Sequence, residues 1–289
     1  MPAETRLPFT KMEGLGNDYV YFEESRLPLK NLAELARRVS DRHFGVGGDG
    51  LVLIGRSAKA DFSMRMFNVD GSEAEMCGNA TRCVGKYVYD RGLTQKTSLT
   101  LETLAGIRKL DLRLSEGRVI SASVDMGEPI LEPARIPVND PGKDFIDREI
   151  TVGGAKYRAT AVSMGNPHVV IPVGDVDALD LPSIGPLFEN HALFPKRINT
   201  EFVQIVSRTE VRMRTWERGS GETLACGTGT CACAVACALN GFTDRSVTVH
   251  LTGGDLLIDW DSNNRVHMTG TATQVFDGEY LVPAGLSLD

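Results

Sequence analysis

The 289-residue chain lacks several features that would each indicate a particular class of protein. It has no apolar run approaching the 18 or so residues that cross a membrane, and its beginning carries an acid and a proline where a signal peptide needs an apolar segment. It also has no block of lysine or arginine, and its net charge is −7. These features argue against a nucleic-acid or membrane partner, so we expect a cytoplasmic protein that handles a small molecule.

Cysteine is sparse as well, at six residues in the chain. This number is too low for a disulfide scaffold in a chain of this size, and cytosolic thiols stay reduced. No Cys-x-x-Cys pair exists, and Cys231-Ala232-Cys233 does not match the spacing of a zinc knuckle. Catalytic chemistry or plain packing must therefore account for the cysteines.

An internal repeat at an offset of 149 residues divides the chain into two similar halves. The length alone favours two domains, and the 42% apolar composition is enough to fill two cores. The matching segments are Gly16-Asn17 with Gly165-Asn166, Cys77-Gly78 with Cys226-Gly227, and Gly92-Leu93-Thr94 with Gly241-Phe242-Thr243. A further echo of 124–128 in 275–279 predicts a first lobe of 1–123, to which 273–289 returns, and a second lobe of 124–272.

Each Cys-Gly pair follows a polar, glycine-containing turn and precedes a stretch with helical character. These stretches, 80–91 and 230–240, run up to a glycine that is a plausible helix stop. Shorter helices are expected over 29–38 and 181–189, and strands over 19–22, 51–54, 169–173 and 202–206. We therefore predict an α+β fold of two pseudo-symmetric lobes, each a mixed sheet around a central helix, with the active site in the cleft between them.

The two cysteines are thus expected at helix starts, where the helix dipole favours a thiolate and lowers a pKa that is ordinarily about 8.5. The free N–H groups at the same helix ends bind anions such as a carboxylate. Racemisation needs one group to remove an α-proton and another to deliver a proton to the opposite face. Cys77 and Cys226 together fit that requirement.

The alternative is that Cys77 and Cys226 are small buried apolar residues, as most free cysteines are. Two cysteines in register within a duplicated Cys-Gly frame favour catalysis over that interpretation. The remaining cysteines have no such context, so we assign Cys83, Cys231, Cys233 and Cys237 to helix packing.

Several motifs resemble those of the diaminopimelate epimerase family, from Phe9 to the last predicted strand. They are Gly14-Leu15-Gly16-Asn17-Asp18, Phe67-Asn68-Val69-Asp70-Gly71-Ser72-Glu73, Met76-Cys77-Gly78-Asn79, Gly165-Asn166-Pro167-His168, Glu217-Arg218-Gly219 and Ala225-Cys226-Gly227-Thr228-Gly229. The resemblance implies a commonly dimeric enzyme that needs no pyridoxal phosphate, metal or other cofactor. It also implies interconversion of LL- and meso-diaminopimelate on the path to lysine and peptidoglycan.

The resemblance also implies roles for individual residues. Cys77 and Cys226 would be the two acid/base groups, and the carboxylate at the reacting centre would be bound by Gly78, Asn79, Gly227 and Thr228. His168 and Glu217 would orient the substrate ammonium and tune the thiols. The distal amino-acid end would be held by Asn17, Asn68, Asn166, Asn199 and Arg218, the last through a bidentate guanidinium fork.

One position departs from the family pattern, because some members carry glutamine where this chain has Gly50. Gly50 is the repeat equivalent of Asn199, which favours a position facing the cleft, although a turn glycine is an equal alternative. Two other functions stay open: racemisation of another amino acid such as histidine, and a non-catalytic, phenazine-biosynthesis-like protein of the same fold. Retention of both cysteines disfavours the second.

Overall fold

The chain forms two compact units in a computed structural model, which describes residues 5–27 and 31–282. One unit comprises Met1–Val124 with Gly270–Asp289, and the other comprises Asp125–Thr269. The chain leaves the first unit within strand β8 (Arg118–Gly127) and re-enters it within β17 (Val266–Gly270). The sequence placed these limits near 124 and 273; of the predicted returning segment, residues 283–289 lie outside the described part.

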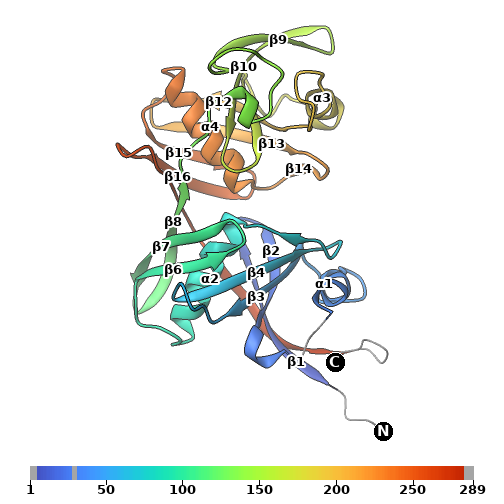
Figure 1. The fold of residues 1–289 in the computed structure, drawn as a ribbon, viewed down its shortest axis with the longest axis vertical. Coiled ribbons are helices and arrows are strands. Elements are labelled where there is room, and N and C mark those ends of the chain that lie inside the picture. The colour runs from blue at the N-terminus through green and yellow to red at the C-terminus, as the bar shows by residue number, and fades with distance from the viewer. Residues whose placement is uncertain (1–4, 28–30, 283–289) are drawn as a thin grey trace. The chain divides into compact units, whose positions relative to one another are not determined.

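The first unit is a mixed sheet with two α-helices. Its other strands are β1 (Arg6–Gly14), β2 (Asn17–Glu23), β3 (Gly50–Gly55), β4 (Phe62–Asn68), β5 (Glu73–Ala74), β6 (Ser98–Thr103), β7 (Gly106–Ser115) and β18 (Thr273–Leu281). Its helices are η1 (Glu24–Arg26), α1 (Leu32–Ser40) and α2 (Gly78–Asp90). Although β1 and β18 stand near opposite ends of the sequence, they pair antiparallel and lie side by side (Figure 1).

The second unit repeats this plan. Its strands before β17 are β9 (Arg148–Val152), β10 (Ala155–Ser163), β11 (Pro167–Pro172), β12 (Asn199–Ile205), β13 (Glu210–Glu217), β14 (Gly221–Thr223), β15 (Ser246–Leu251) and β16 (Gly254–Trp260). Its helices are η2 (Pro133–Arg135), α3 (Leu181–Glu189) and α4 (Gly227–Leu239).

Strand pairing follows the same order in both units, as a duplication requires. In the first unit, β2 pairs antiparallel with β1 and parallel with β3, and β4 pairs parallel with β6. The corresponding pairs β10–β11, β11–β12 and β13–β15 have the same directions. Helices α2 and α4 start 149 positions apart, at Gly78 and Gly227. The predicted α+β class is therefore confirmed.

The helices α2 and α4 are the central elements of their units. Ten of the 13 residues in each helix are buried, and α4 is almost entirely apolar, which is typical of a helix enclosed on all sides. Cys83, Cys231, Cys233 and Cys237 are all buried within these helices, consistent with packing. Among the described residues, no helix combines the length and the apolar character needed to span a membrane.

The predicted helix limits were partly wrong. The helices expected from 80 and 230 begin earlier, at Gly78 and Gly227, directly after the cysteines. The one expected over 181–189 has those limits. Of the helix expected over 29–38, residues 29 and 30 lie outside the described part; α1 begins after Asn31, whose side chain accepts a hydrogen bond from the Glu34 N–H, and it extends to Ser40.

Candidate active site

Cys77 and Cys226 each immediately precede a central helix, as the sequence predicted. Both residues have extended backbone conformations, with φ of −135° and −115°, and the helices start at the glycines that follow. The first N–H groups of a helix have no partner within it, so each cysteine stands beside backbone donors that can bind a group outside the helix.

In the first unit, Cys77 is partly exposed and contacts the amide of Asn17. Its sulfur lies 3.2 Å from the Asn17 Oδ1 atom, which also accepts a 3.4 Å hydrogen bond from the Asn79 amide. The Asn17 NH₂ group donates to the Asp49 carboxylate over 2.7 Å. Because Asp49 accepts only, it fixes the Asn17 amide with its oxygen toward the thiol.

Asn68 and Gly50 lie opposite each other in the pairing of β3 and β4. The Asn68 NH₂ group donates to the Ser72 hydroxyl at 3.0 Å. A Cβ atom on Gly50 would overlap the Phe67 carbonyl oxygen and would lie 2.9 Å from the Tyr19 ring. Gly50 is therefore a strand glycine at a close approach of the backbone, which corrects the alternative that it is a turn glycine.

In the second unit, Cys226 is buried, with 5% of its surface exposed. Its sulfur lies 3.7 Å from the Thr228 hydroxyl. Burial, followed by the charges of Glu217 and Glu201, raises the pKa of the Cys226 thiol well above its usual range. Hydrogen bonds from the Gly229 N–H and Thr228 favour the thiolate but are outweighed. The expectation that the helix start lowers this pKa was wrong, because it neglected burial and the two carboxylates.

Glu217 ends β13 and adjoins Cys226. Burial raises the pKa of the Glu217 carboxyl, against hydrogen bonds from Thr223 and Cys226 that lower it. The Thr223 hydroxyl donates to Glu217 Oε1 over 2.5 Å. Glu217 and Cys226 thus form a hydrogen-bonded pair in which ionisation of one group makes ionisation of the other less favourable.

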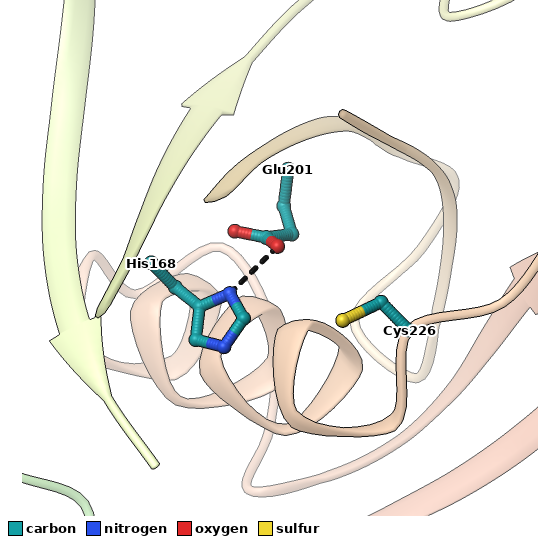
Figure 2. A group of neighbouring side chains, drawn as sticks. All are labelled: His168, Glu201 and Cys226. Carbon is teal, nitrogen blue, oxygen red and sulfur yellow. Dashed lines mark hydrogen bonds and ion pairs between the residues drawn. The ribbon is translucent and has the colours of Figure 1, made fainter. Parts of the chain in front are cut away.

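His168 and Glu201 lie beside Cys226 and are fully buried (Figure 2). His168 Nδ1 lies 2.8 Å from Glu201 Oε1, and His168 Nε2 lies 3.0 Å from the oxygen of Asn166. The two residues come together because β11 and β12 are parallel, with Val170 opposite Glu201. Glu201 was missed from the sequence; the available indication was a carboxylate directly before the apolar pair Phe202-Val203 in a predicted strand.

Asn199 and Arg218 are joined through the backbone. The Asn199 amide donates to the Pro167 carbonyl at 3.0 Å and accepts from the Arg218 N–H at 2.9 Å. The exposed Arg218 guanidinium donates to the Lys196 carbonyl at 3.1 Å. Asn199 is therefore placed to hold the Arg218 backbone, and within residues 5–27 and 31–282 the guanidinium has donors left besides the one that meets Lys196.

Sequence comparison places the chain among known enzymes. The family model described as diaminopimelate epimerase matches residues 9–132 and 160–275. A diaminopimelate epimerase from Desulfovibrio desulfuricans is 59% identical over 96% of this chain and 99% of its own length. One from Acetivibrio thermocellus is 58% identical over 94% of this chain and 97% of its own length. The chain belongs to the diaminopimelate epimerase family. It is therefore an isomerase.

Solved structures with the same fold are more distant in sequence than these members of the diaminopimelate epimerase family. A Bacillus anthracis phenazine biosynthesis protein of the PhzF family has a TM-score of 0.67 at 19% identity, covering 96% of this chain and all of that one. A hydroxyproline epimerase from Agrobacterium vitis has a TM-score of 0.66 at 14% identity, covering all of this chain and 96% of that one. At these identities the likeness concerns the fold alone.

Within each unit, the structure brings most predicted site residues of the diaminopimelate epimerase family into contact. Asn17, Asn79 and Cys77 share one cluster, and His168 and Asn166 share another with Cys226 and Glu217. Ligand atoms of His168, Glu201 and Cys226 lie within 4.8 Å of one another, a spacing that a metal ion could bridge. We assign them to hydrogen bonding, because both ring nitrogens of His168 are already engaged.

Proposed function

We propose that the chain interconverts LL-2,6-diaminopimelate and meso-diaminopimelate by a two-base mechanism. The observation that carries this proposal is the pair of cysteines at equivalent helix starts in a chain 59% identical to a diaminopimelate epimerase. We assign Cys77 and Cys226 as the two catalytic groups that serve opposite faces of one α-carbon.

In this mechanism a thiolate on one cysteine removes the α-proton, and the electron pair of the C–H bond passes to the α-carbon and its carboxylate. The thiol of the other cysteine then donates its proton to the opposite face. One sulfur ends protonated and the other deprotonated, so atoms and charge balance. The raised pKa of Cys226 supports a resting state in which Cys226 is the thiol.

The carbanion needs stabilisation, because an α-proton is a weak acid. We assign that role to the helix starts, with Gly78, Asn79, Gly227 and Thr228 holding the carboxylate at the reacting centre. Preorganised N–H donors at a helix end stabilise negative charge as it develops. Burial of Gly78 and Gly227 supports this assignment, since donors shielded from water act more strongly.

We assign the distal end of the substrate to Asn17, Asn68, Asn166, Asn199 and Arg218, and the ammonium group at the reacting centre to Glu217 and His168. The exposed guanidinium of Arg218 supports a contact with the distal carboxylate, since a guanidinium binds a carboxylate through two parallel hydrogen bonds.

We further propose that the protein is a homodimer in the cytoplasm. The half-exposed apolar side chains on β18 support a dimer interface at that strand; they are Val275, Phe276 and Leu281.

Turnover assays with LL-diaminopimelate, meso-diaminopimelate and L-histidine test the substrate. We expect epimerisation of both diaminopimelate isomers, with solvent deuterium entering at the α-carbon, and none with histidine. Activity on histidine alone would contradict the proposal, as would turnover without deuterium exchange. Light scattering after size-exclusion chromatography tests the dimer, and a monomer at micromolar concentration would contradict it.

A further inference from the structure

The turn between β13 and β14 carries two of the residues assigned to the substrate. Glu217 is the last residue of β13 and pairs with Gly221 of β14, and the Thr223 hydroxyl also holds its carboxylate. Arg218 follows in the turn and is exposed. Strand pairing therefore fixes Glu217, whereas the position of Arg218 depends on contacts made by the turn itself.

The carboxylate of Glu189, at the end of α3, holds this turn. Its Oε1 atom accepts the Gly219 N–H at 3.0 Å, and its Oε2 atom accepts the Trp216 indole N–H at 2.8 Å. The Arg197 guanidinium also donates to Oε1, at 2.9 Å. Only 9% of the Glu189 side chain is exposed, and burying a carboxylate is costly unless such donors surround it. One carboxylate thus connects α3 to two other segments of the second unit.

Glu189 reaches these donors because α3 lies directly against Trp216. A Cβ atom on Gly185 would fall 2.2 Å from the Trp216 ring, so the lack of a side chain there lets the indole lie close to the helix. Gly185 and Glu189 stand at positions i and i+4 and share one helix face. Guanidinium, indole and backbone N–H groups donate only, so the chemistry of the groups fixes the direction of every hydrogen bond to Glu189.

Arg218 is also held by the segment that precedes β12. Its N–H donates to the Asn199 side chain at 2.9 Å, and its guanidinium donates to the Lys196 carbonyl at 3.1 Å. Arg197, within the same segment, has a left-handed backbone with φ of 58°, and its side chain meets Glu189. Glu189 therefore contacts both the turn that carries Arg218 and the segment against which its guanidinium rests.

The equivalent position in the first unit has no carboxylate. Helices α1 and α3 have nine residues each and lie at the repeat offset, which puts Ser40 at the position of Glu189. At the same offset, Val69 stands at the position of Arg218. The carboxylate therefore occurs in the unit whose turn carries an arginine and not in the other, which links its role to that arginine.

We propose that Glu189 is a positioning residue: it holds the turn at Gly219 so that the Arg218 guanidinium meets the distal carboxylate of the substrate. This inference rests on the proposed function, because the contact between Arg218 and substrate is part of that proposal. Loss of the Glu189 carboxylate releases the Gly219 N–H and lets the turn move, while Glu217 stays in its strand. Binding of the distal carboxylate should therefore weaken more than the chemical step.

Hydrogen–deuterium exchange in the full-length protein tests the anchoring without turnover. Mass spectrometry of peptides that overlap at 217–221 reports the Gly219 amide. We expect this amide to be protected in the wild type and to exchange about tenfold faster in Glu189→Met, the effect of losing a hydrogen bond to a charged group. Glu189→Gln keeps one acceptor oxygen, so it should fall between the two, and it replaces Glu189→Met if that variant does not fold.

The matched control is Asp90→Leu, at the far end of α2 from Cys77. Asp90 is another buried carboxylate that accepts a cation and a backbone N–H, from Lys86 and Val119. Its loss should lower stability to a similar extent while leaving exchange at Gly219 and KM unchanged. An equal effect of the control on both quantities would reject a specific role for Glu189.

A double-mutant cycle with Arg218→Met distinguishes action through Arg218 from a general loss of structure. We expect Glu189→Met alone to raise KM for diaminopimelate by about tenfold, with a smaller change in kcat. In the Arg218→Met background the same substitution should change KM by less than about twofold, because the guanidinium that Glu189 positions is already gone.

Two results would overturn the proposal. One is unchanged exchange of the Gly219 amide in Glu189→Met. The other is an equal rise in KM with and without the Arg218 guanidinium, which would mean that Glu189 affects substrate binding by another route. If the wild-type protein does not epimerise diaminopimelate but exchange at Gly219 depends on Glu189 as expected, the proposed substrate is wrong and the anchoring of the turn is supported.

Discussion

Cys77 and Cys226 occupy equivalent positions before α2 and α4, yet their surroundings differ. Cys77 is partly exposed and faces the amide oxygen of Asn17, whereas Cys226 is buried between Glu217 and Glu201. The two halves of the duplication thus hold cysteine thiols in chemically different environments. This difference can be measured in the free protein, because only the thiolate form of cysteine reacts with alkylating reagents.

The first prediction concerns alkylation of these two thiols. Because the pKa of Cys226 is raised, its thiolate is scarce at neutral pH and becomes abundant only as the pH rises toward that pKa. We expect iodoacetamide to modify Cys77 first at neutral pH and Cys226 only under alkaline conditions. Peptide mass spectrometry measures both rates against pH. Faster modification of Cys226 than of Cys77 at neutral pH would contradict the raised pKa of Cys226.

The second prediction concerns loss of either sulfur. Cys77→Ala and Cys226→Ala should each lower epimerisation by about a thousandfold in both directions, because each removes the proton donor or acceptor on one face. The control is Cys237→Ala, a buried cysteine within α4. It should keep its activity and lose roughly 1 kcal/mol of unfolding free energy through lost packing. Substantial activity in either active-site variant would argue against the two-base mechanism.

The duplicated sequence was sufficient to predict the architecture and the positions of both cysteines. The Cys-Gly pair and the glycine after each helix repeat at the same offset. A helix predicted in one half therefore supports the prediction of the equivalent helix in the other half. Helix starts were placed late because Gly78 and Gly227, which begin the helices, are poor helix formers in isolation. In the folded protein both glycines are buried within their units.

The site was less predictable where it depends on pairing between strands. Glu201 lies 33 positions from His168, and only the parallel alignment of β11 and β12 brings their side chains together. The raised pKa of Cys226 has the same origin, because burial and two carboxylates from different strands outweigh the local helix dipole. Local sequence reasoning includes the dipole but not the strands.

The third prediction follows from the charge of Glu217. This carboxylate raises the pKa of Cys226, so Glu217→Gln should lower that pKa. The pH at which Cys226 becomes half-reactive toward iodoacetamide should therefore fall, with no change at Cys77. Glu222→Gln is the matched control, since Glu222 pairs with Arg214 on the neighbouring strand. An equal shift in both variants would indicate a general effect of net charge instead.

The fourth prediction concerns Gly50 in β3. Any Cβ at this position overlaps the Phe67 carbonyl oxygen, and the backbone cannot yield without disturbing the pairing of β3 and β4. Gly50→Ala should therefore lower the free energy of unfolding by about 1–3 kcal/mol. Urea denaturation measures the change. Gly174→Ala is the control, because a Cβ there meets nothing within 4 Å, and it should leave stability almost unchanged. Equal stability of the two variants would mean that β3 and β4 can separate enough to admit a side chain, and that Gly50 is not required by close approach.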